Sequence, residues 1–325
     1  MENFEDRNHI KRFVGTTIDQ KLVTIKGNSF LEYRNKFEKA RDSYVRGEYP
    51  LEISFDTVSY CNLMCKMCYR SFLSNTKHEN MPMEIVDKLV KQIKEFRIPS
   101  VRFAAQTESL LHPDISIILK KITGCDLLDC WIITNGVFLS EYIREIIIDI
   151  PVTVLSVSLD AATPKTYKNI RGGGGLEKVK DNIMNFLSLR QKRNSPLPLL
   201  RVTFVEQADN KHETNLFLDS WKDIADIVDI QTFKDYSILK DTPSKPNNKS
   251  FKCFDPFFRM VVNYDGQLFP CCPGPIYYKS INPVFIQNVD IKSYWQSEEL
   301  LSLTQSIRDK KYPECCKRCL NVMDI

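Results

Sequence analysis

Apolar residues in this chain alternate between short runs, which are typical of strands, and longer stretches with helical spacing. Six short runs predict strands, at residues 51–58, 101–105, 128–134, 152–159, 199–205 and 227–233. Five stretches between them predict helices, at residues 83–96, 115–122, 140–148, 176–190 and 213–224. Strands that are each separated by a helix form parallel βαβ units, and six units are fewer than the eight of a closed barrel. The pattern therefore predicts an α/β fold whose core is an open, partial (β/α)6 barrel.

Further segments flank this barrel. Residues 28–46 place Phe30, Tyr33 and Phe37 near helical spacing and predict an amphipathic helix that packs on the outside of the barrel. Residues 240–252 are polar, contain two prolines and lack periodicity, which is typical of a linker. We therefore expect a helical extension, a barrel, a linker and a small C-terminal domain, at residues 1–50, 51–238, 239–252 and 253–325.

Composition and charge narrow the functional classes. The 325 residues carry 45 Lys and Arg against 41 Asp and Glu, and no stretch concentrates the basic residues, so charge does not indicate a nucleic-acid partner. The N-terminal residues mix acids and bases without an apolar run. The most hydrophobic region, 146–159, is interrupted by Asp149 and Pro151. We expect no signal peptide, no membrane span and a cytoplasmic location.

The chain has 11 cysteines, an odd number that excludes complete internal pairing. In a reducing compartment, clustered cysteines act more often as metal ligands than as disulfides. One cluster, Cys61, Cys65 and Cys68, directly follows the first predicted strand, and a second group lies near the end of the chain. Cys125 and Cys130 stand apart on the helix side of the third predicted strand, and we expect both in the core.

The first three cysteines have the spacing C-x3-C-x2-C. Their thiolates can hold three irons of a cubane cluster, and the fourth iron stays open because no other cysteine is near in sequence. An amino acid could chelate that iron through its amine and carboxylate. The alternative is zinc, but structural zinc takes a closed set of four ligands, and none of the four histidines is close to this loop.

This loop, CNLMCKMC after a first strand, resembles the signature of the radical S-adenosylmethionine (SAM) superfamily, and the similarity continues over residues 51–233. The resemblance implies that Cys61, Cys65 and Cys68 hold a [4Fe-4S] cluster that binds SAM. Relatives usually have an aromatic residue before the third cysteine, with its backbone near the adenine. Met67 occupies that position here.

The resemblance also implies residues that contact SAM. After the second strand the family often reads G-x-G-E-P-L-L-H-P, and its Glu binds the methionyl amine. Glu108 is in place here, but the two glycines and the first proline are replaced, by Ala105, Thr107 and Ser109. A solvated loop carboxylate is the alternative for Glu108. Asn135 lies in a Thr-Asn-Gly turn after the third strand, which is near the cofactor in relatives.

Three more candidates lie at the end of the fourth predicted strand or after it. Ser158 and Asp160 share a face because strand side chains alternate, and this face suits the hydroxyls of a ribose, with a helix cap as the alternative. Arg171 matches a family arginine that pairs with the methionyl carboxylate. The four glycines at 172–175 let the backbone approach a ligand, with a flexible loop as the alternative. They lack the Lys-Ser/Thr of a phosphate loop, so a nucleoside triphosphate is not expected.

The second cysteine group is spread over a predicted hairpin and helix. Residues 260–269 contain two apolar strands around an Asp-Gly turn, which would bring Cys253 and Cys271 together. Cys316 and Cys319 form a C-x2-C pair that arrives from the end of a helix. Four cysteines from two elements can close either a zinc tetrahedron or a cubane, and spacing alone leaves both open.

The spacing C-x12-G-x4-C followed by a distant C-x2-C resembles the auxiliary-cluster half of the SPASM family. It implies one auxiliary [4Fe-4S] cluster in a twitch-type domain, a β-hairpin plus a helix, because the chain stops six residues after Cys319. The spacing is most similar to the aminocyclitol dehydrogenase branch of butirosin biosynthesis. Cys272 and Cys315 could replace their neighbours as ligands, but we expect packed thiols. The alternative is that one delivers a hydrogen atom to a substrate radical, as in related epimerases.

The resemblance implies that a 5′-deoxyadenosyl radical takes a hydrogen atom from a substrate held between the two domains. A fully ligated auxiliary cluster cannot bind substrate directly, so we expect it to transfer electrons. The leading hypothesis is oxidation of a secondary alcohol on a small polyol, sugar or aminocyclitol, with flavodoxin or ferredoxin as external electron donor. The alternatives are a peptide epimerase or crosslinker, and a zinc-stapled binding protein without catalysis.

Overall fold

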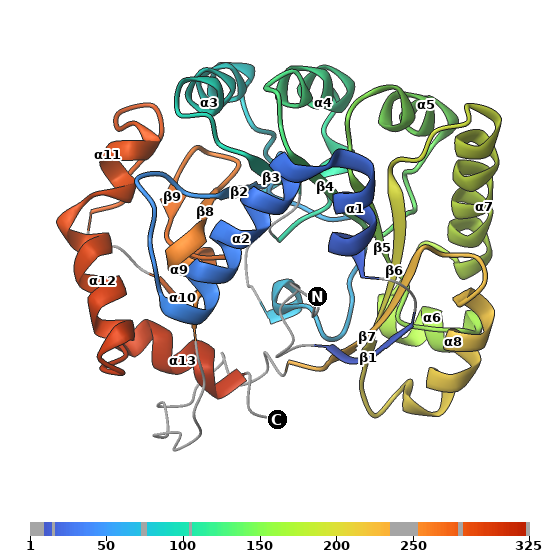
Figure 1. Cartoon of the computed structure of the whole chain (residues 1–325). Helices are drawn as coiled ribbons and strands as arrows, with labels where there is room; N and C mark the ends of the chain where they lie inside the picture. Colours follow the sequence, from blue (N-terminus) through green and yellow to red (C-terminus); the bar gives the residue numbers. More distant parts are fainter. Residues whose placement is uncertain are drawn as a thin grey trace.

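The computed structural model describes residues 10–14, 17–72, 77–103, 106–234, 253–278 and 282–322. A curved sheet is surrounded by an arc of helices that forms its outer layer (Figure 1). No helix within these ranges has both the length and the apolar character needed to cross a bilayer. The predicted linker at 239–252 lies outside the described residues.

All six predicted strands are present and pair in parallel. They are β2 (Glu52–Phe55), β3 (Ser100–Phe103), β4 (Asp129–Thr134), β5 (Val154–Ser158), β6 (Leu199–Glu206) and β7 (Ile227–Thr232). The five predicted helices are α3 (Met83–Glu95), α4 (Ile115–Thr123), α5 (Glu141–Asp149), α7 (Leu176–Lys192) and α8 (Thr214–Trp221). The predicted partial barrel is therefore confirmed.

One helix of the barrel, α6 (Pro164–Arg171), was not predicted. It has only eight residues, which is too short for a clear apolar period. The local signal was its N-terminus, where Thr163 caps the helix and Pro164 occupies the first turn. This helix matters for the site because Arg171 is its last residue.

Side chains along each strand alternate between two environments, as the pleat requires. On β5, Leu155 and Val157 belong to the large core under the outer helices. Val154 belongs to a different cluster on the inner face. Ser156 and Ser158 share the side of Val154, so the inner face becomes polar toward the carboxyl end of the strand.

The N-terminal segment forms β1 (Ile10–Val14), α1 (Ile18–Lys26) and α2 (Asn28–Ser43). The helix predicted at 28–46 ends at Ser43, because Tyr44 has a left-handed φ of 53°. The sequence prediction missed α1, which begins with a capping box between Thr17 and Gln20. It also missed β1, which pairs antiparallel with β7.

The two N-terminal helices do not lie on the outside of the barrel, which corrects the prediction. Ile18 and Leu22 of α1 and Phe30 and Tyr33 of α2 pack in one cluster with residues at or near the starts of four strands. Those strand residues are Trp131, Val154, Leu199 and Ile227. The helices therefore cover the end of the barrel where the strands begin, and Figure 1 shows them crossing in front of the sheet.

The predicted C-terminal hairpin is present, but it joins the barrel. The elements here are α9 (Asp255–Phe258), β8 (Arg259–Val262), β9 (Leu268–Phe269), α10 (Gly274–Tyr277), α11 (Ile291–Trp295), α12 (Glu298–Arg308) and α13 (Glu314–Val322). β8 and β9 are antiparallel, and β8 pairs in parallel with β2. Among the described residues, the strands form one sheet in the order β1-β7-β6-β5-β4-β3-β2-β8-β9.

A buried ion cluster fixes this junction. Glu52 of β2 is fully buried and pairs with Arg102 of β3 at 2.7 Å and with Arg259 of β8 at 2.5 Å. Desolvation alone would raise the pKa of this carboxyl, but the two guanidinium groups outweigh it and lower the pKa to about 2. The hairpin is therefore tied to the barrel by charge as well as by strand pairing.

Candidate functional site

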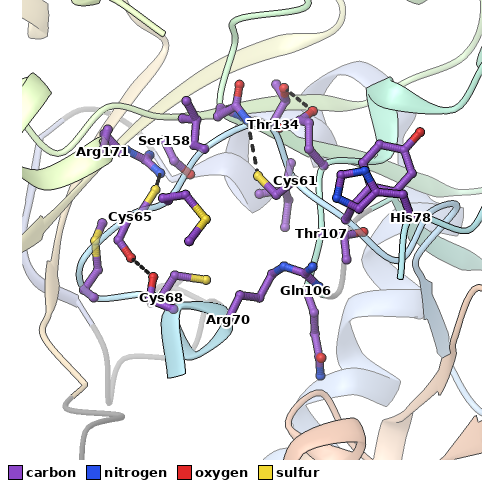
Figure 2. A pocket seen from close by; sticks show the side chains of 18 residues that line it. Cys61, Cys65, Cys68, Arg70, His78, Gln106, Thr107, Thr134, Ser158 and Arg171 are labelled. Atoms are coloured by element: carbon purple, nitrogen blue, oxygen red, sulfur yellow. Dashed lines mark hydrogen bonds between the residues drawn. The ribbon is translucent and has the colours of Figure 1, made fainter. Parts of the chain in front are cut away.

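The loop after β2 places three cysteines in one cavity. Cys61, Cys65 and Cys68 line a cavity of about 290 Å³ at the carboxyl ends of the strands (Figure 2). Cys65 is 7% exposed and the other two are half-buried. The loop is held by backbone hydrogen bonds, in which Cys68 N–H donates to the Cys65 carbonyl at 3.0 Å and Lys66 N–H donates to the Ile170 carbonyl at 2.9 Å.

The environment of these thiols bears on whether they fit a cluster. Desolvation raises the pKa of Cys61, and raises the pKa of Cys68 to about 11. Both groups are therefore protonated until a cation replaces the proton. Within the described ranges, no group of three Cys, His, Asp or Glu side chains is arranged to hold a single metal ion. Three sulfur donors around one cavity fit a cubane, whose ligands bind separate irons.

Glu108 lies in the same cavity and is not a solvated carboxylate. It is 2% exposed and precedes the short helix η2 (Ser109–Leu111). Its carboxylate accepts hydrogen bonds from Thr134 Oγ1 and from Asn135 N–H, both at 2.7 Å. Desolvation raises its pKa to about 7, although these hydrogen bonds act in the opposite direction. Ala105, which replaces a family glycine, lies outside the described residues.

Asn135 connects the turn after β4 to the cysteine loop. Its Nδ2 donates to Asn62 Oδ1 at 2.9 Å and lies 3.8 Å from Cys61 Sγ. Its Oδ1 accepts from Val137 N–H at 3.0 Å. A Cβ on Gly136, where φ is +77°, would lie 2.8 Å from Val179 Cγ1. Glycine therefore lets this turn fit beneath the cavity.

We expect Glu108→Gln to weaken SAM binding by about 10- to 100-fold, because a charged hydrogen bond to the amine is lost. In the unaltered protein the carboxylate ionises as the pH rises through about 7, so SAM should bind more tightly at pH 8 than at pH 6. The variant should lose this pH dependence, which isothermal titration measures. Glu213→Gln changes another buried carboxylate, bonded to Thr163 and Thr166, and is the control. An unchanged pH profile in Glu108→Gln would contradict the assignment.

Arg171 extends from the end of α6 into the cavity. Its Nε lies 3.1 Å from Asp160 Oδ2, and its Nη1 lies 3.4 Å from Cys65 Sγ. Its Nη2 is buried and has no hydrogen-bond partner among the described residues. A buried donor without a partner is costly, and a carboxylate would satisfy it. This atom fits the methionyl carboxylate of SAM.

The interpretation of Asp160 as a ribose contact is corrected by the structure. Asp160 is 1% exposed and is absent from the cavity lining, whereas Ser158 lines it. One Asp160 oxygen accepts from Val205 N–H at 2.7 Å and the other faces Arg171. A φ of 59° at Asp160 breaks the alternation that predicted a shared face. Asp160 therefore positions Arg171, and Ser158 remains the candidate ribose contact.

The glycine run packs against the cysteine loop. Gly172 ends α6 with a φ of 72°, and a Cβ there would lie 2.8 Å from the Met64 carbonyl oxygen. At this position glycine permits close approach of two backbone segments, so flexibility alone does not account for it. Met67, from the same cysteine loop, also lines the cavity, and its nearness to the adenine stays a prediction.

Arg70, His78 and Gln106 are among the cavity residues that were not predicted. Arg70 lies two residues after Cys68, and Figure 2 shows its side chain crossing toward Gln106. Arg70 and Gln106 lie close in sequence to the cysteine motif and to Glu108, and this nearness could have predicted that they line the cavity. His78 stacks on the ring of Tyr60 at 4.7 Å, and nothing in the local sequence signals that contact.

The second cysteine group gathers around the end of the hairpin. Cys253 precedes α9, Cys271 follows β9, and Cys316 and Cys319 lie on α13. Burial raises the pKa of Cys271, and Cys253 and Cys319 add to the shift. A hydrogen bond with Cys315, and then burial, raise the pKa of Cys316, with smaller effects from Cys253 and Cys271. These thiols are therefore close enough to influence one another electrostatically.

The two neighbouring cysteines have different surroundings. Burial raises the pKa of Cys272, and after burial the strongest influences are Arg259 and Asp255, with Asp56 of the barrel also contributing. Cys272 and Cys315 in turn influence the pKa of Cys319, so Cys271 and Cys272 both lie near the second cysteine group. The four-cysteine assignment remains a prediction. Cys125 and Cys130 are buried in the core, as expected.

An open parallel barrel brings three thiols, a carboxylate and an unpaired guanidinium nitrogen into one cavity, as expected for an enzyme that binds SAM at an iron–sulfur cluster. Residues 56–203 match the family model of the Radical SAM superfamily. Residues 253–320 match SPASM, an iron-sulfur cluster-binding domain. The chain therefore carries a radical SAM domain and a SPASM domain, and these domains use SAM and iron–sulfur clusters as cofactors.

Curated relatives match over part of their length. The probable GTP 3′,8-cyclase of Methanococcus maripaludis strain C7 is 27% identical over 173 residues, which cover 53% of this chain and 55% of that protein. The GTP 3′,8-cyclase of Peptoclostridium acidaminophilum is 30% identical over 145 residues, which cover 44% and 43%. The chain thus spans about half the length of the curated relatives it matches.

Solved structures share the fold at low sequence identity. SuiB of Streptococcus suis bound to the precursor peptide SuiA has a TM-score of 0.59 and 15% identity, covering 84% of this chain and 70% of SuiB. BtrN in complex with AdoMet and 2-DOIA has a TM-score of 0.55 and 17% identity, covering 82% of this chain and 91% of BtrN. At these identities the similarity shows the fold alone.

Proposed function

We propose that this protein is a radical SAM dehydrogenase that oxidises a secondary alcohol on a small polyol, sugar or aminocyclitol. The observation that supports this most is the connection of both cysteine groups to neighbouring strands. β2 leads into Cys61, Cys65 and Cys68, and the hairpin that pairs with β2 leads into Cys271. An electron acceptor beside the radical site suits an oxidation, because an alcohol radical becomes a ketone by losing one electron and the hydroxyl proton.

The proposed ligands follow from this arrangement. Cys61, Cys65 and Cys68 would hold the SAM-binding cluster on the segment 51–238. One auxiliary cluster would be held on the segment 253–325, by Cys253, Cys271, Cys316 and Cys319.

When bound, the clusters and SAM supply a 5′-deoxyadenosyl radical and an acceptor for the electron that the substrate loses. The chain orients SAM through Glu108 at the amine and Arg171 Nη2 at the carboxylate. Asp160 holds the guanidinium in place, and Asn135 holds the turn beneath the cavity. The first electron would come from an external donor such as flavodoxin or ferredoxin.

A peptide-modifying enzyme, either an epimerase or a crosslinker, is the second candidate. It is favoured by the fold that this chain shares with SuiB, which was solved with a precursor peptide. Such enzymes often carry a separate peptide-recognition domain. The described N-terminal residues form β1, α1 and α2, and the two helices pack onto the starts of the strands.

A substrate screen tests the proposal. Reduced holoenzyme with SAM is offered aminocyclitols, sugars and polyols, with short peptides as the comparison set, and 5′-deoxyadenosine release is measured. A true substrate deuterated at its alcohol carbon should transfer deuterium to 5′-deoxyadenosine and yield a ketone in about equal amount. Deuterium transfer from peptides only would contradict the proposal and support the second candidate.

A further inference from the structure

The side chain of Gln106 connects two segments. One is the cysteine loop after β2, and the other is the turn after β9 that carries Cys271 and Cys272, here called the auxiliary-cysteine turn. Gln106 Oε1 accepts a hydrogen bond from the hydroxyl of Tyr69 at 2.5 Å, and its Nε2 donates to the Cys272 carbonyl at 3.0 Å. Tyr69 directly follows Cys68, and Cys272 directly follows Cys271. One glutamine therefore joins the residues adjacent to two proposed cluster ligands, one from each group.

The Cys272 backbone is held from both sides. Its carbonyl accepts from Gln106, and its N–H donates to Asp255 Oδ2 at 3.1 Å. Asp255 is itself held by Arg259 at 3.3 Å, and Arg259 belongs to the buried ion cluster with Glu52. The turn after β9 is thus fixed by one bond from its own domain and one bond from the barrel.

The barrel end of this connection lies next to SAM-binding groups. The backbone N–H groups of Gln106 and Thr107 donate to Asp56 Oδ1 at 2.9 and 3.0 Å. Asp56 is 1% exposed and immediately follows β2. Glu108, the proposed partner of the SAM amine, is two residues further along the same loop. A ligand that engages Glu108 therefore acts on a short, tightly anchored loop that also carries Gln106.

We propose that Gln106 is a positioning residue that communicates occupancy of the SAM site to the auxiliary-cysteine turn. Because hydrogen bonds and backbone placement around a cluster set its reduction potential, a ligand in the SAM site should shift the potential of the auxiliary cluster through this bond. The inference rests on the proposed ligand sets and is independent of which substrate is oxidised.

Redox titration of the reconstituted holoenzyme tests the inference. The auxiliary signal is identified as the one that Cys253→Ala removes, and its midpoint potential is measured with and without saturating S-adenosylhomocysteine. This probe has the amino acid and adenosine of SAM but is not cleaved on reduction. The unaltered protein should show a shift. The shift should vanish in Tyr69→Phe, which loses the hydrogen bond from the Tyr69 hydroxyl to Gln106. It should also vanish in Gln106→Glu, which keeps an acceptor for Tyr69 but loses the donor to the Cys272 carbonyl.

Gln92→Leu is the matched control. Gln92 of α3 also bonds a C-terminal backbone group, accepting from Ile291 N–H at 2.6 Å, but it is absent from the SAM cavity. This variant should keep the shift. Absence of a shift in the unaltered protein, its persistence in both test variants, or its loss in Gln92→Leu would each overturn the inference. None of these results bears on the alcohol oxidation, which the product screen decides separately.

Discussion

Replacing Cys61, Cys65 and Cys68 together with alanine should reduce 5′-deoxyadenosine formation from SAM to background. These side chains are the sulfur donors of the cavity that also contains Glu108 and Arg171, so without them no open iron can bind the amino acid of SAM. Anaerobic incubation with dithionite and SAM, followed by chromatography, measures the product. Iron should fall from about eight atoms per chain, two cubanes of four, to about four.

Cys125→Ala is the control for this experiment. Cys125 is a buried core thiol far in sequence from both cysteine groups, and its replacement should leave the iron content and 5′-deoxyadenosine formation near the values of the unaltered protein. Continued 5′-deoxyadenosine formation in the triple variant would refute the assignment of the SAM-binding cluster.

Changing Cys253 and Cys319 to alanine should separate SAM cleavage from substrate oxidation. Both residues belong to the second cysteine group, so the first cavity keeps its three thiols and should still yield 5′-deoxyadenosine. The ketone should fall to background, because the substrate radical has no nearby electron acceptor. Product analysis by mass spectrometry, scored against 5′-deoxyadenosine, measures this ratio.

Cys315→Ala is the matched control here, because Cys315 neighbours the proposed ligand Cys316 but is not itself proposed to bind iron. It should retain ketone formation. An unchanged ratio of ketone to 5′-deoxyadenosine in the Cys253 and Cys319 variant would mean that the second cluster is only structural, which the proposed oxidation does not allow.

The barrel could be predicted because its strands and helices are marked by local patterns. The apolar runs of the six strands are buried on the helix side. Such runs can be recognised in the sequence without knowing which strands pair. The pairing of β8 with β2 could not be predicted in this way, because it joins segments about 200 residues apart in sequence. The charges that stabilise it, Glu52 with Arg102 and Arg259, are likewise informative only once the strands are adjacent.

The site was predictable where a motif fixed both residue type and spacing. Glu108 lies in the cavity although its loop lacks the family's glycines, and its contact with SAM stays a prediction. Asp160 was misassigned because strand alternation was extended past the end of β5, where a left-handed residue turns its side chain toward Arg171. Gln106 was missed because its partners come from two distant segments.

The central claim is that three cysteines leave one iron open for SAM. Electron–nuclear double resonance on the reduced holoenzyme, with SAM labelled by 15N in its amine and 17O in its carboxylate, tests this most directly. The account predicts hyperfine coupling of both labels to the cluster that Cys61, Cys65 and Cys68 hold. Absence of both couplings while SAM is bound, together with a fourth protein ligand on that iron, would contradict it.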